Sequence, residues 1–157
     1  MTHVSLPVSR QAGIAALIAR ANRLMAAIPY WLVALITRIS IAAVFWQSGQ
    51  TKLDGWQISA SAIELFRNEY KLPLLDPTLG AHLAVIAEHV FPALLVVGLA
   101  TRLSALALLL MTLIIQIFVY PDAWATHGTW AACFLILMRR GAGEVSLDHL
   151  IAQRRRR

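Results

Sequence analysis

Residues 79–120 read LGAHLAVIAEHVFPALLVVGLATRLSALALLLMTLIIQIFVY, and this stretch decides the fold. It contains two apolar runs, from about Leu79 to Leu99 and from about Leu103 to Tyr120. Each run is close to the length of about 20 residues that an α-helix needs to cross a bilayer. Because only Ala100–Arg102 separate the runs, we predict two neighbouring, antiparallel membrane spans, as in an up-down helix bundle.

A further span is predicted on each side of this pair. The first span runs from about Ile28 to Gln50 and has aromatic residues near both ends, as expected at two membrane interfaces. The fourth runs from about Ala123 to Met138 and is short, so crossing requires some thinning of the bilayer or snorkelling. The predicted fold class is therefore all-α, a transmembrane four-helix bundle.

The composition of the whole chain agrees with a membrane protein. Of the 157 residues, 59% are hydrophobic and only 14% are charged, whereas soluble domains carry about a quarter charged residues. The apolar content also excludes a disordered chain. Cys133 is the one cysteine, which excludes an internal disulfide and a C-x-x-C redox pair.

Two amphipathic helices are predicted outside the spans. Val8–Ile28 carries Arg20 and Arg23 after an apolar start. It lacks the compact apolar core and cleavage site of a signal peptide, so an interfacial helix is favoured. Gly55–Tyr70 places large apolar residues at helical spacing and predicts an amphipathic helix between spans one and two, either on the membrane surface or capping the bundle. The predicted organisation is an amphipathic segment over 1–27, a membrane domain over 28–150 and a basic tail over 151–157.

The distribution of positive charge predicts the orientation of the chain. With a cytoplasmic N-terminus, ten lysines and arginines face the cytoplasm and three face the opposite side, while Arg38 lies within a span. The positive-inside rule therefore places both termini in the cytoplasm. The net charge of +6 thus reflects topology, and we expect no nucleic-acid partner. Arg154–Arg157 are expected near anionic lipid head groups.

Two opposite charges lie near the middle of the first two spans, namely Arg38 and Glu88. Charges at this depth are costly and call for a partner or a function. Because the two spans are antiparallel and the depths match, we predict that Arg38 and Glu88 form a buried charge pair. Such a pair either fixes the helix register or belongs to a functional site, and both interpretations remain open.

His82 and His89 are candidates for ligand binding or proton transfer. They are seven residues apart, so they share one helix face but lie about 10 Å apart along the axis. This separation is too large for one metal ion, and no metal site is predicted. The alternative role for each is a hydrogen bond to a neighbouring helix. His127 is expected on the same side of the membrane as His82, which is only a weak indication of a shared metal or haem site.

Five short motifs follow one another along the chain. They are Arg38, Ser48-Gly49-x-x-Lys52-Leu53, Glu88, Gly98-Leu99-Ala100-Thr101-Arg102, and Arg140-Gly141-x-Gly143-x-x-Ser146-Leu147-Asp148. In their order and spacing the chain resembles the DoxX family of small four-helix membrane proteins, from about Ile36 to Leu150. The last motif also has a local interpretation. Gly141 is expected to end span four in the left-handed conformation, and Ser146 to cap a short surface helix with Asp148 in its first turn.

The resemblance implies a membrane component of redox systems in the bacterial cytoplasmic (inner) membrane. A related family is a subunit of a thiosulfate:quinone oxidoreductase, and other members are linked to resistance to oxidative and thiol stress. The sequence carries no motif for a flavin, an iron–sulfur cluster or a nucleotide. Electron transfer would therefore need a quinone, a haem or a partner protein.

Three functions remain open. The leading hypothesis is a redox-associated subunit, accessory to a quinone-linked oxidoreductase, that binds a quinone or other lipophilic ligand within the bundle. In this interpretation Arg38 and Glu88 are the central charges, and His82 or His89 exchanges protons with the ligand. The alternatives are a non-catalytic scaffold for other redox or membrane proteins, and a small transporter or metal-handling protein that uses the two histidines and Glu88. No catalytic residue and no oligomeric state are assigned.

Overall fold

The computed structural model describes residues 8–73 and 75–155, so Arg156 and Arg157 of the predicted tail lie outside the described residues. The helices are α1 (Val8–Ala26), α2 (Tyr30–Gln50), α3 (Ala60–Leu65), α4 (Pro77–Val97), α5 (Thr101–Phe118), α6 (Trp124–Arg140) and α7 (Leu147–Arg154). A π-helical turn, η1, covers Phe66–Tyr70. Strands β1 (Leu53–Asp54) and β2 (Gln57–Ile58) pair as an antiparallel hairpin. Helices account for 77% of the chain, which confirms the predicted helical fold class.

Three of the described helices are long and apolar enough to cross a membrane. They are α2, α4 and α5, which correspond to the first three predicted spans. The fourth predicted span corresponds to α6, which has 17 residues and begins with the polar stretch around His127. By length and hydropathy, the first three of the four predicted spans are thus candidate membrane-spanning helices.

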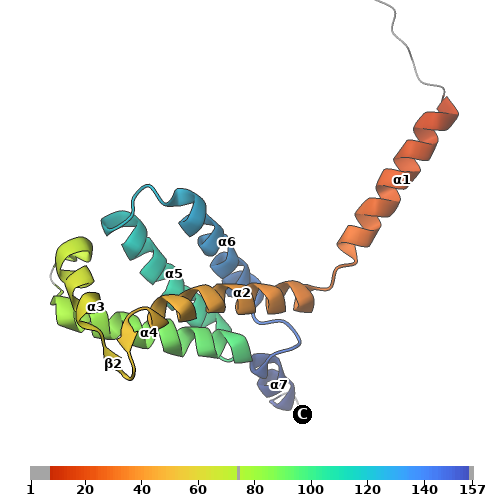
Figure 1. Cartoon of the computed structure of the whole chain (residues 1–157). Helices are drawn as coiled ribbons and strands as arrows, with labels where there is room; N and C mark the ends of the chain where they lie inside the picture. Colours follow the sequence, from red (N-terminus) through yellow and green to blue (C-terminus); the bar gives the residue numbers. More distant parts are fainter. Residues whose placement is uncertain (1–7, 74, 156–157) are drawn as a thin grey trace, which may run out of the picture.

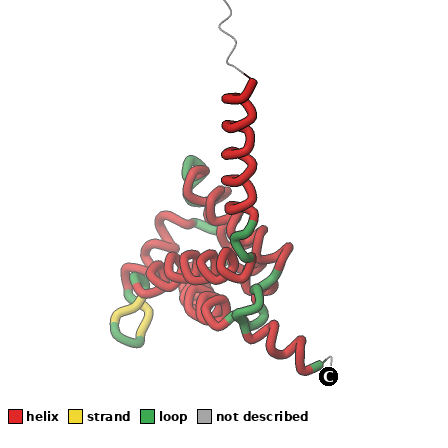
Figure 2. The backbone as a smooth tube through the Cα atoms, turned by 90° about the vertical axis from the view of Figure 1, so that its right-hand side faces the viewer, coloured by secondary structure: helices red, strands yellow, loops and turns green. Residues whose placement is uncertain are grey.

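The four helices α2, α4, α5 and α6 pack against one another. The most extensive contacts are between α2 and α4 and between α5 and α6, and Figure 1 shows α2 and α4 side by side. The core between them contains Leu95, Leu108, Phe134 and Leu137, all fully buried. Large apolar side chains such as Leu103 and Ile117 are exposed on the outside, as expected for helices that face lipid. In Figures 1 and 2, α1 projects away from this packing.

The two ends of the packed helices differ in structure. At one end, which we call the hairpin end, α2 finishes and α4 begins, next to the β1–β2 hairpin. At the other, which we call the α7 end, α2 and α5 begin, and α4 and α6 finish beside α7. Because α2 and α4 run in opposite directions, their side chains lean toward opposite ends.

The connection between α2 and α4 differs from the single helix predicted over Gly55–Tyr70. Its first part is the hairpin, in which Gly55 adopts φ +61° at the first position of a two-residue turn. The helix starts only after Ser59, whose side chain accepts a hydrogen bond from the Ala62 backbone N–H at 3.1 Å. The aromatic residue at the hairpin tip, Trp56, is 99% exposed. The Asp54–Gly55 turn signal therefore prevails locally over the helical spacing of the apolar residues.

At the α7 end the structure confirms the predicted Ser146 cap, but Gly141 adopts a conformation other than the predicted one. Ser146 Oγ accepts a hydrogen bond from the His149 N–H at 3.2 Å and so caps α7. Gly141 ends α6 at φ +82°, ψ −167°, an extended conformation almost restricted to glycine rather than the predicted left-handed helical one. Asp148 lies in the first turn of α7, and its carboxylate accepts from the N–H groups of Ala100 (2.8 Å) and Thr101 (2.9 Å). It therefore also caps the start of α5.

Candidate functional site

Glu88 in α4 forms a buried ion pair with Lys52, which follows the end of α2. Lys52 Nζ lies 2.9 Å from Oε1 and 2.8 Å from Oε2 of Glu88, and the two side chains are 5% and 3% exposed. Ser48 Oγ donates a second hydrogen bond to Oε1 at 2.8 Å, and Lys52 Nζ also lies 3.0 Å from this hydroxyl oxygen. Lys52 reaches Ser48 because residues four apart near a helix end face the same side. The carboxylate of Glu88 is thus held by two side chains from one segment.

Arg38 does not pair with Glu88, so the predicted charge pair is wrong. The buried Arg38 guanidinium donates to the carbonyl oxygens of Leu95 (3.2 Å) and Val96 (3.5 Å) in the last turn of α4, and of Val145 (2.6 Å). Side chains lean toward the N-terminus of their own helix. In antiparallel helices this lean adds to a separation that the helix register already sets, because Glu88 lies level with Ser48, ten residues and about 15 Å along α2 from Arg38. The carbonyls that end α4 carry partial negative charge and compensate the guanidinium there.

Gly98 makes room for this arrangement. It ends α4 at φ +69°, and a Cβ added there would collide with the Arg38 guanidinium. The Gly98 carbonyl accepts from the Asp148 N–H at 2.9 Å. Arg38, Gly98 and Asp148 together therefore tie the end of α4 to the start of α7, which is a structural role for three of the motif positions.

A cavity of about 180 Å³ lies beside Glu88. We call it the Glu88 chamber. Its lining residues come from α2, η1, α4, α5, the α5–α6 connection and α6, and they are Val44, Phe45, Ser48, Tyr70, Glu88, Ile115, Tyr120, His127 and Trp130. The chamber combines an apolar and aromatic wall with several polar side chains, which is the usual character of a small-molecule site.

His127 contributes the imidazole ring of the chamber. The residue is 6% exposed, and its Nδ1 lies 2.6 Å from Gln116 Oε1. Gln116 Nε2 in turn donates to the Pro121 carbonyl at 2.5 Å, which fixes the amide orientation. Since an amide oxygen only accepts hydrogen bonds, Nδ1 carries a hydrogen, and Nε2 is the ring's acceptor. The Gln116 side chain therefore sets which nitrogen of His127 is available to a ligand.

Two tyrosines complete the polar lining. Burial, with a smaller contribution from the Glu88 charge, raises the pKa of the Tyr70 hydroxyl above its usual value. The Tyr120 hydroxyl donates to Glu69 Oε1 at 2.8 Å, and this bond raises the pKa of Tyr120. Both phenols consequently remain protonated at neutral pH and serve as hydrogen-bond donors. The Tyr120–Glu69 bond also links η1 to the α5–α6 connection at the chamber.

The structure does not bring His82 and His89 into the chamber. His82 is exposed, and its Nδ1 bonds the Thr78 carbonyl at 2.7 Å. His89 bonds the Val85 carbonyl through Nδ1 at 2.7 Å and the Gln50 side chain through Nε2 at 2.8 Å. Both rings are thus engaged with nearby groups outside the chamber. Within the described residues no three His, Cys, Asp or Glu side chains are grouped as metal ligands.

Gly49 allows α2 and α4 to approach each other next to the chamber. A Cβ added at Gly49 would lie 2.6 Å from His89 Cε1 and 3.0 Å from Glu88 Cβ. The motif Ser48-Gly49-x-x-Lys52 therefore serves one purpose, since glycine permits the close contact and the flanking residues hold Glu88. The sequence alone marked Lys52 as a motif position but did not indicate that it pairs with Glu88. The remaining motif residues Arg102 and Gly141 lie at the α7 end.

The comparisons with known proteins identify the family of the chain. The DoxX family model matches residues 33–121, more than half of the chain. This match includes Arg38, Lys52 and Glu88 but not His127. A Haemophilus influenzae protein described as uncharacterized is 30% identical over 125 residues, which is 74% of this chain and 82% of that protein. No solved structure matches the chain. The chain belongs to the DoxX family of membrane proteins.

Proposed function

We propose that the chain is a redox-associated membrane subunit and that the Glu88 chamber binds the ring of a quinone-like lipophile. The observation that carries this proposal is the buried Glu88–Lys52 pair at the wall of a cavity that also presents His127 and Tyr70. A protein cavity of about 150 Å³ accommodates a benzene ring. The chamber, at about 180 Å³, is therefore suited to one substituted ring rather than to a whole lipid.

The polar groups of the chamber are suited to form hydrogen bonds with both the oxidised ring, a quinone, and the reduced ring, a quinol. The Tyr70 hydroxyl is suited to donate to a quinone carbonyl. His127 Nε2 is suited to accept from a quinol hydroxyl, and so is Glu88 Oε2, because a carboxylate oxygen that is paired with Lys52 at 2.8 Å keeps a second lone pair. Groups at hydrogen-bond distance from an exchangeable proton are the ones that can transfer it. We therefore assign proton exchange with the ring to Glu88 and His127, in place of His82 or His89.

In this proposal the electrons are supplied or accepted by a partner protein. Conversion of a quinone to its quinol takes up two electrons and two protons. The sequence carries no flavin, iron–sulfur or nucleotide motif, so a partner redox protein would supply or accept the electrons. The role proposed for this chain is accessory, namely to hold the ring and to exchange its protons.

We further propose that α6 is a fourth span and that both termini face the cytoplasm of a bacterium. A helix of 17 residues is about 25 Å long, which is only slightly less than the thickness of a hydrocarbon core. Arg139 and Arg140 at its end are then near one interface, where arginines snorkel. In this arrangement the chamber lies in the outer half of the membrane, with α1 and the basic tail on the cytoplasmic surface.

Purification of the full chain in a mild detergent tests the proposed ligand. Lipophiles are extracted from the purified protein and identified by mass spectrometry. We expect a quinone to copurify, and Glu88→Gln and His127→Ala to reduce its amount severalfold because each removes a polar group of the chamber. His82→Ala is the matched control, since His82 is exposed and lies outside the chamber. The proposal fails if no quinone copurifies, or if both chamber variants retain as much as the control.

A further inference from the structure

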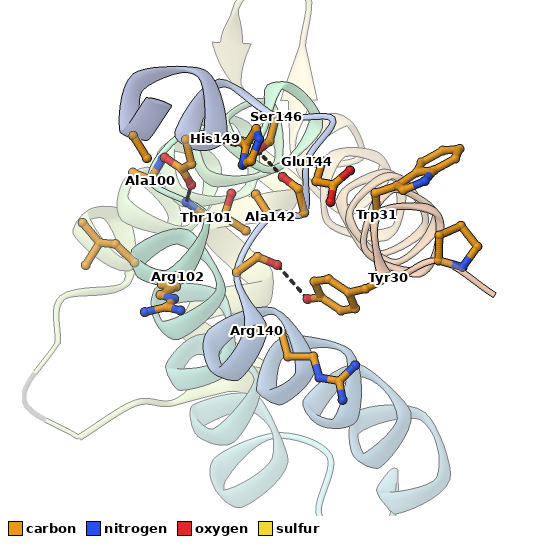
Figure 3. Close-up of a pocket in the computed structure, with 16 residues that line it drawn as sticks. Tyr30, Trp31, Ala100, Thr101, Arg102, Arg140, Ala142, Glu144, Ser146 and His149 are labelled. Atoms are coloured by element: carbon orange, nitrogen blue, oxygen red, sulfur yellow. Dashed lines mark hydrogen bonds between the residues drawn. The ribbon is translucent and has the colours of Figure 1, made fainter. Parts of the chain in front are cut away.

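A second and larger pocket opens at the α7 end, far from the Glu88 chamber along the helices. Its volume is about 950 Å³, and its lining includes Tyr30, Arg102, Arg140 and Asp148. Figure 3 shows Tyr30, Arg102 and Arg140 reaching this pocket from three different helices, α2, α5 and α6. The pocket is therefore built by the tertiary packing and not by one local motif.

The positive charges of the arginines in this pocket favour the binding of an anion. Among the described residues, neither Arg102 nor Arg140 lies within ion-pair distance of a carboxylate. The Arg140 guanidinium carbon lies 5.3 Å from the centre of the Tyr30 ring, and the Tyr30 hydroxyl donates to the Gly141 carbonyl at 2.7 Å. These contacts position the arginine without neutralising it.

The acidic residues of the same pocket only partly offset this positive charge. They are Glu144 and Asp148. The carboxylate of Asp148 already accepts the N–H groups of Ala100 and Thr101. Glu144 is exposed at the pocket, so in the balance of charges one unengaged carboxylate stands against two arginines. A phosphate group, which a guanidinium binds through two parallel hydrogen bonds, fits this balance of charges.

An apolar groove adjoins the pocket, between the start of α2 and the last turn of α6. Its volume is about 350 Å³, and it is lined by Ile28, Val33, Ile136 and Arg139 together with Tyr30 and Arg140, the two residues that it shares with the pocket. Val33 and Ile136 are 38% and 41% exposed, on helices that pack within the membrane protein. A charged pocket beside an apolar groove matches a phosphate head group attached to an acyl chain.

From the positively charged pocket and the apolar groove that shares two of its residues, we infer that the α7 end binds an anionic phospholipid. The phosphate lies between Arg102 and Arg140, and an acyl chain lies in the groove between α2 and α6, against Val33 and Ile136. The inference is independent of the ligand of the Glu88 chamber. An inorganic phosphate ion would use the same arginines but would gain nothing from the groove, so the groove distinguishes a lipid from a free ion.

Native mass spectrometry of the full-length protein in detergent tests this site. The probes are phosphatidylglycerol and, as the zwitterionic comparison, phosphatidylcholine. We expect selective retention of phosphatidylglycerol, and Arg102→Gln and Arg140→Gln each to weaken it roughly fivefold, the effect of about one arginine near a membrane surface. Arg154→Gln removes the same charge from the end of α7, outside the pocket, and is expected to leave retention unchanged. Equal losses in all three variants would show unspecific attraction and overturn the inference.

A second arm separates a lipid from a free phosphate. Ile136→Trp fills the groove without changing any charge, and we expect it to weaken phosphatidylglycerol binding severalfold. Addition of inorganic phosphate is expected not to displace the lipid. If Ile136→Trp binds phosphatidylglycerol as the unchanged protein does, or if inorganic phosphate displaces the lipid, the site is not a phospholipid site.

Discussion

Among the described residues two cations are buried, Arg38 and Lys52, and different groups compensate their charges. Arg38 donates to carbonyl oxygens, two of them in the last turn of α4, so a helix end supplies the negative partner. Lys52 meets a full negative charge on Glu88, with Ser48 beside it. A cation removed from such a buried pair leaves the remaining charge without compensation, which costs far more than the loss of a solvated pair.

Lys52→Met is therefore expected to lower the free energy of unfolding by about 3 kcal/mol. The double variant Lys52→Met/Glu88→Gln should lose less than the sum of the single variants, because the uncompensated charge is gone. Denaturant titration of the detergent-solubilised protein measures both quantities. Arg67→Gln is the matched control, since Arg67 pairs with Glu64 at the surface with both side chains more than half exposed, and it should cost less than about 1 kcal/mol. A loss in Lys52→Met no larger than that of the control would contradict a buried ion pair.

At the scale of the helices, α7 is attached to the rest of the chain by a small number of specific bonds. No residue of α7 is buried, so apolar packing contributes little to its position. Instead, Asp148 caps the start of α5, and its backbone N–H bonds the Gly98 carbonyl. One side chain thus serves the first turn of α7, where its negative charge is favourable, and the first turn of α5, whose N–H groups it satisfies.

Asp148→Ala is expected to destabilise the protein by about 1–2 kcal/mol, the usual effect of losing a helix cap. Loss of the link should also make α7 more accessible, so limited trypsin digestion in detergent should release the C-terminus faster. Glu144→Ala provides the control, because this acid lies in the loop just before α7 but its side chain caps no helix among the described residues. The role of Asp148 is disproved if both variants show the same melting temperature and the same rate of cleavage.

At the scale of the whole molecule, the number of crossings depends on α6. Three described helices meet the length and hydropathy of a span, and α6 is slightly shorter. Three crossings would place the two ends of the chain on opposite sides of the membrane, whereas four place them on the same side. The ten-to-three distribution of lysine and arginine favours four crossings with both ends in the cytoplasm.

Cysteine labelling in intact cells tests this orientation. In a Cys133→Ala background, Ser61→Cys in α3 should react with a membrane-impermeant maleimide. Gly13→Cys in α1 and Gln153→Cys in α7 should react only after the cells are permeabilised, because we expect both to face the cytoplasm. The background variant without added cysteine should remain unlabelled. Opposite accessibility of the cysteines at 13 and 153 would show an odd number of crossings and would exclude α6 as a span.

Local patterns in the sequence were sufficient for the helical class, for three of the spans and for the Ser146 cap, because each of these depends on residues close together in the chain. Hydropathy over about 20 residues measures whether a segment prefers lipid, and a cap involves residues three positions apart. The hairpin at Leu53–Ile58 also had a local signal, Asp54–Gly55, but the apolar spacing around Trp56 fitted a helix equally well. In the structure the turn prevails, and Trp56 lies exposed at the tip of the hairpin.

The tertiary structure alone decided which charges and rings meet. The sequence by itself predicted that Arg38 and Glu88 lie at similar depth in neighbouring antiparallel helices, but in the structure Glu88 lies level with Ser48 and Gly49, whereas Arg38 lies level with the last turn of α4. The sequence did not determine their partners, because the register of the two helices depends on their packing, and the lean of the side chains toward opposite helix ends adds to the separation. Lys52, Tyr70 and His127 reach Glu88 or its chamber from three different segments. Their convergence depends on how α2, η1, α4 and α6 pack, and that is a property of long-range contacts rather than of any single stretch of sequence.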